Sequence, residues 1–407
     1  MIADTCRRLL RRFTGKGAAA SSPGALRHEM STARIEPNAS DKNKPDKENV
    51  QQRDIQGVGA AIRAGQAKLA QSKLRRWRDR YLRARRNAVQ LALSRLDKEN
   101  CTEEERQALT LLLEDTESEA VTAALVMRSD SRTLQLSGVA SFRQLLTLRS
   151  RRSQLAGAGP EWRLNSKEKG ARFAKREGLA CPRVHASNVR AAEVDFIPCS
   201  VIKPASGAGS RGVYLILGNG TVFEPGRNRV LGSEAALRQA IKEDLVSGRV
   251  RQDRWIVEEL VTEDEAGLKP GCDLKFYCFY GEVGLVLEVE RSEHTHYCEW
   301  DGSGSTIVTG KYIGQEFAGR GATPEQRALA AEISLKIPAP FIRIDFIRSH
   351  SSPDGMMFCE FTPRPGNYHR FDLETDRRLG DSFLAAEARL EKDLLQGRSF
   401  AKLFLKR

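Results

Sequence analysis

Two short apolar runs near the C-terminus, FIRIDF at residues 341–346 and MMFCEFT at 356–362, constrain the fold more than any other feature. Both are rich in the β-branched and aromatic residues that favour strands, and a segment short enough for a turn separates them. The runs therefore predict two strands that pair through the turn at 347–355. Each strand carries one acid among apolar neighbours, Asp345 in the first and Glu360 in the second.

The two acids are expected on one face of the strand pair. Residues two apart in a strand share a side, so Arg343 points with Asp345, and Phe358 is expected to point with Glu360. Two unpaired carboxylates in a site of low dielectric would repel each other and lose hydration. Mg²⁺ typically takes one or two protein carboxylates together with phosphate oxygens and water. The pattern therefore predicts a Mg²⁺ site, and the alternative is a structural ion pair with Arg343.

The positive charge of the chain lies in its first part. Residues 1–160 contain 30 Lys/Arg and 18 Asp/Glu, whereas the other 247 residues contain 36 and 35, so the net charge of +13 divides into +12 and +1. No apolar run has the length of a membrane-spanning helix, so we do not expect the chain to cross a bilayer. None of the 8 cysteines forms a CxxC pair, which disfavours zinc and suits reduced thiols in a cytosol.

Residues 1–56 are predicted to be a disordered basic leader, and 57–155 a helical hairpin or short bundle. An apolar and aromatic stripe recurs at spacings of three and four, as on one face of a helix; it comprises Leu74, Trp77, Tyr81, Ala84, Ala88, Ala92 and Leu96. Thr102 and Glu105 have the spacing of a capping box for a second helix. The basic segment 73–86 is compatible with nucleic acid, an anionic membrane or a solvated helix face. We favour the solvated face and expect no specific nucleic acid.

Residues 156–395 are predicted to form an α+β domain, with a front part at 156–257 and a metal-binding lobe at 258–395. The front part contains CSVIKPASGAGSRGVYLIL, which reads as strand, small-residue loop and strand. Glycines in the loop allow close approach of the backbone to an anion, and Lys203 stands at the end of the first strand. A glycine-rich hairpin turn without a ligand is the alternative.

Two further segments carry charges on predicted strands. DRWIVEELV ends in Glu258 and Glu259, which suits an adenine and ribose site or a strand that runs out into solvent. DLKFYCFYGEVGLVLEV is predicted to form a hairpin that turns at Tyr280–Gly281. Asp273 and Lys275 share a face of it, and Arg291 follows its second strand; these charges would contact phosphates or substrate, or simply be exposed.

Taken in order, these motifs resemble the ATP-grasp superfamily, with the closest likeness to the type found in teichuronopeptide and capsule biosynthesis. The resemblance covers about residues 160–390 and includes SKEKGARFAKREGL at its front and FDLETDRRLGDSF at its back. It implies an ATP-grasp fold in which two α+β lobes clasp ATP, preceded here by the helical region and the leader.

The resemblance also implies roles for particular residues. Contacts to ATP fall to Lys203, to the glycine flap (Gly207, Gly209 and Gly212) and to the adenine and ribose site (Glu258, Glu259 and Leu260). Mg²⁺ falls to Asp345, Glu360 and Thr362, the last standing where many of these enzymes have Asn. Stabilisation of the transferred phosphate falls to Lys275, Arg291, Arg343 and Arg364. A front lysine is expected too, and the sequence leaves it open between Lys167 and Lys169.

The implied function is an ATP- and Mg²⁺-dependent ligase that activates a carboxylate as an acyl phosphate for capture by an amine. Its substrates would be small molecules on the way to a cell-surface polysaccharide or peptide precursor. The alternatives are a non-catalytic or regulatory nucleotide-binding protein recruited through its basic helices, and a small-molecule phosphotransferase. We expect a cytoplasmic protein, with peripheral attachment to the inner face of the membrane left open.

Overall fold

The computed structural model describes residues 57–96, 98, 100–114, 116, 118–130, 139–206, 210–291 and 294–404. The chain divides into two compact units, residues 1–77 and 78–407, and each is considered by itself. The predicted basic leader, 1–56, lies outside the described residues, as do Gly207 and Gly209 of the predicted flap. Within the described ranges, no helix combines the length and the apolar character needed to cross a membrane.

The first helices are α3 (Ala67–Leu96), α4 (Glu103–Glu114) and α5 (Ala123–Asp130). The predicted capping box is confirmed, since the backbone N–H of Glu105 donates to the Thr102 hydroxyl and the N–H of Thr102 donates to the Glu105 carboxylate, both at 3.2 Å. The predicted stripe is buried only in its C-terminal half, because Trp77 and Tyr81 remain 40% and 38% exposed. A small core joins the three helices, with buried side chains from Val89, Ala92, Leu93, Leu96, Leu109, Leu113 and Leu125.

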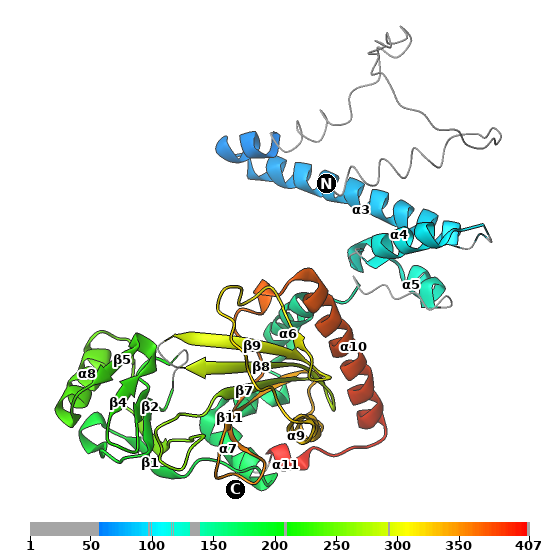
Figure 1. Ribbon diagram of the computed structural model, residues 1–407. Helices are drawn as coiled ribbons and strands as arrows, with labels where there is room; N and C mark the ends of the chain where they lie inside the picture. The colour runs from blue at the N-terminus through cyan, green and yellow to red at the C-terminus, as the bar shows by residue number, and fades with distance from the viewer. Residues whose placement is uncertain are drawn as a thin grey trace, which may run out of the picture. The chain divides into compact units, whose positions relative to one another are not determined.

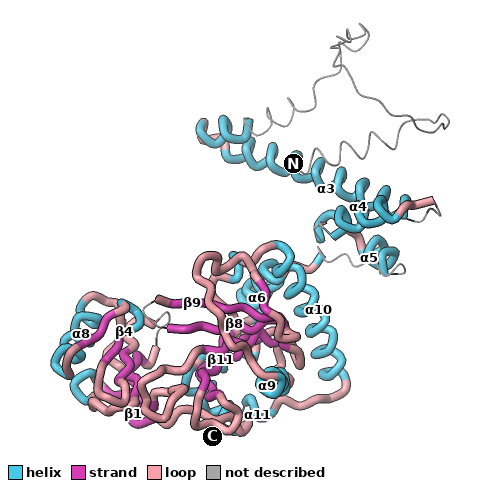
Figure 2. Tube along the Cα trace, in the orientation of Figure 1, coloured by secondary structure: helices cyan, strands magenta, loops and turns pink. Residues whose placement is uncertain are grey.

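Two antiparallel sheets of six strands follow, and the strands in Figure 2 fall into these two groups. The first sheet has the order β1-β6-β2-β3-β4-β5; its strands are β1 (Val184–Val189), β2 (Ser200–Pro204), β3 (Tyr214–Ile216), β4 (Val222–Glu224), β5 (Arg229–Leu231) and β6 (Trp255–Glu259). The second has the order β10-β9-β8-β7-β11-β12; its strands are β7 (Asp273–Cys278), β8 (Val283–Arg291), β9 (Thr295–Asp301), β10 (Thr306–Ile307), β11 (Ile342–Arg348) and β12 (Met356–Thr362).

Helices cover the sheets, as Figure 1 shows for α8 against the first sheet and α10 beside the second. The helices of this part are α6 (Phe142–Ala156), α7 (Lys167–Arg176), α8 (Glu234–Val246), α9 (Pro324–Ser334), α10 (Leu373–Leu395) and α11 (Ala401–Phe404). Short 3₁₀ turns lie between them: η1 (Ser118–Ala120), η3 (Pro160–Asn165), η4 (Ala191–Glu193), η5 (Pro225–Arg227) and η6 (Tyr368–Arg370). This mixture of helices with two sheets is the predicted α+β, ATP-grasp class of fold.

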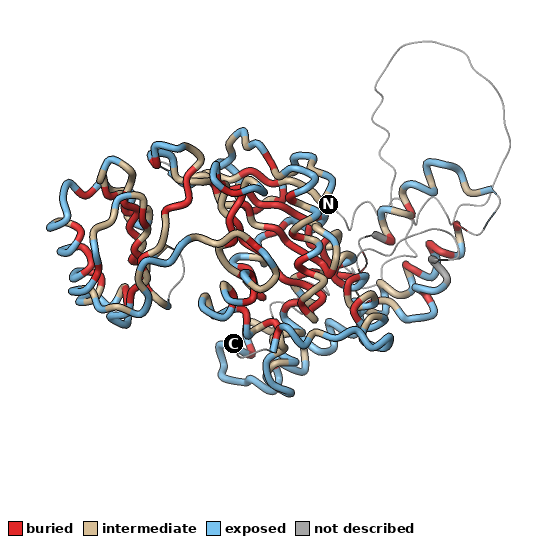
Figure 3. The backbone as a smooth tube through the Cα atoms, turned by 90° about the horizontal axis from the view of Figure 1, so that it is seen from below, coloured by how far each residue is buried: buried red, intermediate tan, exposed pale blue. Residues whose placement is uncertain are grey.

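The two faces of the second sheet have different environments. One face packs on α7 and α9 through a core that includes Phe173, Phe276, Ile333 and Phe346. The other packs on α6 and α10 through a second core that includes Phe142. Buried residues follow the strands of this sheet in Figure 3. The second core covers only part of its face, and charged side chains of β7, β11 and β12 occupy the rest.

The predicted hairpins form as expected. β2 pairs with β3 around the glycine loop, and β7 pairs with β8 through Tyr280 and Gly281, whose φ angles of 38° and 95° are those of a tight hairpin turn. β11 pairs with β12, and Asp345 lies directly opposite Glu360 in that register. The expectation that both acids share one face of adjacent strands is therefore confirmed.

The expectation that Phe358 shares a side with Glu360 is wrong. The register changes after the pair Asp345–Glu360, so that Phe346 lies opposite Phe358 and Cys359 is the extra residue of a β-bulge. The bulge reverses the alternation, and Phe358 enters the core with Phe361, their ring centroids 4.6 Å apart. Strict alternation cannot predict this, because a bulge depends on how the partner strand pairs.

The predicted domain boundaries stay predictions, but two observations bear on them. Helix α6 lies before the boundary at 156, yet its Phe142 and Leu146 belong to the core of the second sheet. The division between 257 and 258 falls inside β6, which pairs with both β1 and β2. Glu258 and Glu259 thus belong to the first sheet.

Candidate active site

The register of the second sheet aligns charged residues across neighbouring strands. Lys275 of β7 lies opposite Asp345 of β11, which lies opposite Glu360 of β12. Tyr277, Arg343 and Thr362 form the adjacent row in the same three strands. Because directly opposed residues point to the same side of a sheet, both rows present their side chains on one face.

Asp345 is the most buried charged residue of these two rows. Arg343 donates to both of its oxygens, from Nε to Oδ1 at 2.7 Å and from Nη2 to Oδ2 at 2.6 Å, and Lys275 donates to Oδ2 at 2.9 Å. Burial raises the pKa of Asp345, but the two cations outweigh it and hold the pKa below its usual value. The ion pair with Arg343, considered above as the alternative to a metal, is therefore present.

The charge network continues along β7. Lys275 also contacts Asp273 at 3.1 Å, and Asp273 forms an ion pair with Arg291. Burial raises the pKa of Asp273, yet Arg291 and Lys275 together bring it down to about 2. Burial lowers the pKa of Lys275 while Asp273 and Asp345 raise it, and the two acids prevail. Ion pairs between neighbouring acidic and basic side chains thus hold the residues beside the Asp345–Glu360 pair in place.

Glu360 is much less constrained than Asp345. Its side chain is 38% exposed, against 1% for Asp345, and its contact within the network is Arg343 Nη2 at 3.9 Å. Thr362, the third predicted metal ligand, accepts a hydrogen bond from Arg343 Nη2 at 3.2 Å. Of the three predicted ligands, Glu360 has the carboxylate oxygens that are freest to bind a cation.

The first sheet contributes the second part of the site. Lys203 of β2 forms an ion pair with Glu258 of β6. Burial lowers the pKa of Lys203, but Glu258 raises it, Cys359 and Glu360 add to that effect, and the net shift is upward. Lys203 therefore lies within electrostatic reach of β12, although it belongs to the other sheet. Gly212, at the far end of the loop after β2, has a φ of 70°, which a residue with a side chain rarely adopts.

Glu259 and Leu260, the other residues predicted to contact adenine or ribose, form hydrogen bonds to the backbone of neighbouring segments. The Glu259 carboxylate accepts from the Arg183 backbone N–H at 3.0 Å, and the Leu260 N–H donates to the Cys199 carbonyl at 2.8 Å. Leu260 is buried. These two residues support the strand end, and neither approaches Lys203 in the contacts of the described residues.

Of the two candidate front lysines, Lys167 lies near the site. Burial lowers its pKa, the positive charge of Lys203 lowers it further, and Glu360 opposes the shift. Lys169 is exposed on the same helix, where its backbone N–H donates to the cap residue Ser166. Arg364, a predicted catalytic residue, is exposed and stacks over the Trp162 ring at 5.9 Å.

Sequence reasoning did not assign three residues that the structure brings to this region. The sequence leaves Asp273 open between a contact to phosphates or substrate and an exposed strand charge, and in the structure it links Arg291 to Lys275. Cys359 lies within reach of Lys203; burial raises the pKa of its thiol to about 12, against the opposing effect of that lysine. Lys311 follows β10 and is buried near Arg343. No sequence signal marks the last two, since one depends on a bulge and the other on a loop.

The donor set can be tested against Mg²⁺. Among the residues that the structure describes, no group of three or more His, Cys, Asp or Glu side chains forms a cage for a metal. Asp345 and Glu360 supply two carboxylates, and Asp345 Oδ1 accepts from Arg343 Nε at 2.7 Å. This set fits an ion that takes its remaining ligands from phosphate and water, as Mg²⁺ does.

Comparison with protein families decides the identity. Residues 145–384, more than half of the 407, match the family described as TupA-like ATP-grasp. The chain belongs to the TupA-like ATP-grasp family. The match includes every predicted site residue, from Lys167 on α7 to Arg364 after β12. A search of curated proteins found no match to this TupA-like protein.

Solved structures similar to the TupA-like chain include several ATP-grasp ligases. The ligase PsnB, complexed with a precursor variant, Mg and ADP, is 15% identical, covers 65% of this chain and 68% of its own, and has a TM-score of 0.33. The D-alanine–D-alanine ligase of Bacillus anthracis, complexed with ATP, is 15% identical with 56% and 68% covered and a TM-score of 0.33. The L-amino acid ligase of Bacillus licheniformis is 11% identical, with 54% and 46% covered and a TM-score of 0.32.

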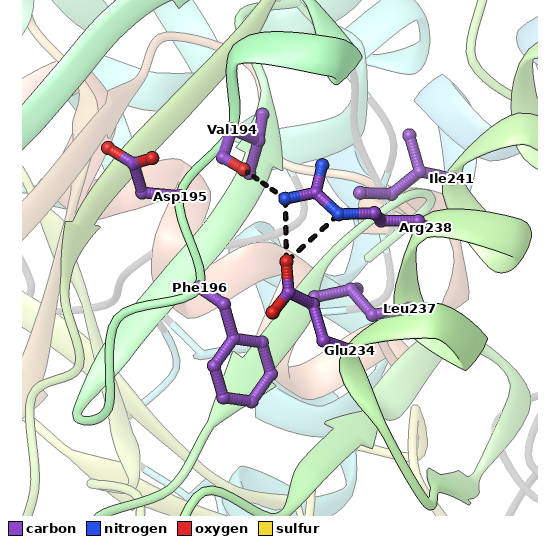
Figure 4. A pocket seen from close by; sticks show the side chains of 7 residues that line it. All are labelled: Val194, Asp195, Phe196, Glu234, Leu237, Arg238 and Ile241. Carbon is purple, nitrogen blue, oxygen red and sulfur yellow. Dashed lines mark hydrogen bonds and ion pairs between the residues drawn. The ribbon is translucent and has the colours of Figure 1, made fainter.

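A small pocket elsewhere in the TupA-like fold has a structural explanation. It lies between α8 and residues 194–196 and is shown in Figure 4. Arg238 closes it by binding Glu234 one turn earlier on α8 and the Val194 carbonyl at 3.3 Å. Arg238 and Glu234 thus neutralise each other, and none of the predicted site residues lines this pocket.

Proposed function

We propose that the protein is an ATP- and Mg²⁺-dependent ligase that joins a carboxylate to an amine in the biosynthesis of a cell-surface polysaccharide or peptide precursor. Membership in the TupA-like ATP-grasp family supports use of ATP and the ligase class. The observation that carries the proposal is the cross-strand pair of Asp345 and Glu360, set beside Arg343 and Lys275 on one sheet face.

The reaction has two steps. An oxygen of the substrate carboxylate forms a bond to the γ-phosphorus of ATP as the bond to ADP breaks, which yields an acyl phosphate. The amine then attacks the acyl carbon, inorganic phosphate leaves with the bonding electrons, and the amine loses a proton. Catalysis of this kind depends on positioning and on neutralising charge, and it needs no covalent protein nucleophile.

The residues have separable tasks in this scheme. Lys203 and Lys167 bind the phosphates of ATP. Asp345 and Glu360 would hold Mg²⁺, which neutralises the phosphate oxygens when bound. Arg343, Lys275 and Arg291 oppose the negative charge of the transferred group. Glu258 keeps the Lys203 ammonium in place before ATP arrives, because the two already form an ion pair.

The proposal extends to the chain's location. ATP is a cytoplasmic substrate, and we infer that the protein acts there, with the partly exposed basic segment 73–86 as the part that would attach it to the inner face of the membrane. The structure supports this second point only through the exposure of α3, and it forms no part of the catalytic argument.

A melting experiment tests the proposed function. The wild type should be stabilised by ATP with Mg²⁺ more than by ATP with a chelator, since a ligand that binds only the folded state raises its melting temperature. ADP release should then be screened with pairs of amino acids, uronic acids and peptidoglycan-like acceptors. Absence of any nucleotide-dependent shift would overturn the proposal.

A further inference from the structure

Lys311 is a buried cation outside the predicted site. Its ammonium donates to the Gly366 carbonyl at 3.2 Å, and the residue is 9% exposed. Within the part of the chain that the structure describes, no carboxylate lies close enough to form an ion pair with it. An ammonium has three N–H donors, so this bond leaves two of them to satisfy.

Glu299 acts on Lys311 electrostatically, but the two form no ion pair among the described residues. Glu299 of β9 is buried and accepts from the Thr309 hydroxyl at 2.7 Å and from the Thr309 N–H at 3.3 Å. Burial raises the pKa of Glu299, and Thr309 and Lys311 only partly offset that effect. Aromatic rings provide the other support for the ammonium, which stands 5.0 Å from the Tyr312 ring centroid and 4.9 Å from that of Phe371.

A second unsatisfied donor lies beside this lysine. The hydroxyl of Tyr277 is buried and has no hydrogen-bond partner among the described residues. Its ring packs against Phe371, with centroids 6.0 Å apart, and Phe371 is also the ring that faces Lys311. Leaving a buried hydroxyl unpaired costs about 1–3 kcal/mol, so the arrangement is unfavourable unless a ligand completes it.

Arg343 connects these donors to the proposed site. It lies directly opposite Tyr277 on the neighbouring strand, and its positive charge acts on Lys311. A guanidinium has five N–H donors, and three of those in Arg343 have acceptors, two on Asp345 and one on Thr362. Burial raises the pKa of the Tyr277 hydroxyl, and the Arg343 guanidinium opposes that rise, which places Arg343 beside the set formed by Lys311 and Tyr277.

We propose that Lys311, Tyr277 and Arg343 bind the carboxylate that is to be phosphorylated. Lys311 and Arg343 are cations that can only donate, and Tyr277 can add its O–H as a donor, so the three groups together favour an oxyanion over a neutral or cationic group. Their link to Asp345 and Glu360 sets this oxyanion next to the transferred phosphate. An attacking oxygen must come within about 3–3.5 Å of the phosphorus, so the adjoining group is the reacting carboxylate. This inference rests on the proposed function and adds the donor subsite to it.

A structural role for Lys311 is the competing explanation. Its bond to Gly366 joins the loop after β10 to the loop after β12, and Asp372 binds Thr309 between the same two loops at 2.7 Å. A tie of this kind would matter for stability but not for anion binding. Variants must therefore be compared on both properties.

The test uses the full chain saturated with Mg²⁺ and ADP, with acetate as the carboxylate probe, inorganic phosphate as the phosphoryl probe and chloride as the control for ionic strength. Melting temperatures are measured as each anion is titrated. The variants are Lys311→Met, Lys311→Arg and Tyr277→Phe, and Lys242→Met is the matched control, since Lys242 is exposed on α8.

We expect acetate to stabilise the wild type and Lys242→Met beyond chloride. Lys311→Met should bind Mg²⁺ and ADP like the wild type but bind acetate at least about tenfold more weakly, as expected for a lost charge-assisted hydrogen bond. Lys311→Arg should restore part of the acetate response, and Tyr277→Phe should lose part of it.

Three results overturn the inference. The first is that acetate does not stabilise the wild type, and the second is that Lys311→Met responds to acetate like the wild type. The third is that only phosphate binding depends on Lys311, in which case the subsite holds the transferred phosphoryl group. Failure of Mg²⁺ and ADP to stabilise the wild type is a different result, because it removes the proposed function itself.

Discussion

Asp345 and Glu360 stand directly opposite each other on β11 and β12, but only Glu360 is open to solvent. Asp345 is enclosed by Arg343 and Lys275, whose positive charges it balances. Two acids that look equivalent in the sequence therefore differ in their surroundings: Asp345 also balances two buried cations, whereas Glu360 contacts Arg343 only at 3.9 Å within this network.

Removing the two acids should have unequal effects on stability. Asp345→Asn removes the acid that two buried cations share, although Lys275 keeps Asp273, and it should lower the unfolding free energy by about 3–5 kcal/mol. Glu360→Gln removes a half-exposed charge and should cost less than about 1 kcal/mol. Both should abolish Mg²⁺-dependent ADP release. Urea unfolding and an ADP assay measure the two properties, and equal destabilisation of both variants would contradict this account.

The ion pair of Lys203 and Glu258 should govern affinity for ATP. Lys203→Met removes a charge-assisted bond to the phosphates and leaves Glu258 facing them, so KM for ATP should rise by roughly tenfold to a hundredfold. Glu258→Gln keeps the lysine and should have a smaller effect. Lys269→Met, at an exposed lysine paired with Glu263, is the control. If it raises KM as much as Lys203→Met, general charge and not this contact is responsible.

Gly212, in the loop before β3, should be more sensitive to substitution than Gly220, in the turn between β3 and β4. Gly212 and Gly220 have φ angles of 70° and 80°, so alanine at either costs about 1 kcal/mol in backbone strain. At Gly212 the new Cβ would also lie 2.5 Å from Val250 Cγ2 and 3.0 Å from Pro204 Cγ, whereas nothing lies within 4 Å at Gly220. The crowding should add about 1–3 kcal/mol.

Chemical denaturation compares these two glycine variants, and ATP titration shows whether the flap is disturbed. Gly212→Ala should weaken ATP binding because the glycine ends the loop that follows Lys203. Gly220→Ala should leave ATP binding unchanged. Equal stability of the two variants would mean that Val250 and Pro204 move away from the new Cβ at Gly212 without a measurable loss of stability.

Lys311 should make stability depend on alkaline pH. Burial lowers its pKa from 10.5 to about 8; Glu299 opposes the shift, and Arg343 and Arg370 add to it. Between pH 8 and 10.5 the unfolded chain keeps a proton that the folded chain has released, so the unfolding free energy rises with pH in that window. Relative to Lys311→Met, the wild type should gain up to about 3 kcal/mol across it.

The comparison with Lys311→Met isolates this lysine from other groups that titrate at high pH. Cys272 and Cys359, whose thiol pKa values burial raises to about 12, change stability in the opposite direction, but they are present in both proteins. Urea unfolding at a series of pH values from neutral upward gives the difference. A difference that does not change with pH would show that the Lys311 side chain is already solvated in the fold.

Local patterns in the sequence are enough to predict these strands, their hairpins and which charged residues share a strand face. Alternating apolar residues predict β11 and β12, a glycine after Tyr280 predicts the turn between β7 and β8, and spacing of two predicts that Asp273 and Lys275 meet. These features are local, since each depends on residues that lie within one strand or one turn.

Which charged side chains neutralise one another, and which can still bind a ligand, depends on the tertiary structure. The bulge at Cys359, the burial of Asp345 between Arg343 and Lys275, and the approach of Lys203 to β12 depend on strands and sheets far apart in the sequence. Lys311 is the clearest case, because a lysine in a loop has no local signal of burial. Glu299, Phe371 and Arg343 surround it, and only folding brings these residues together. The loss of water around the Lys311 ammonium and the charges that act on it therefore depend on the tertiary structure.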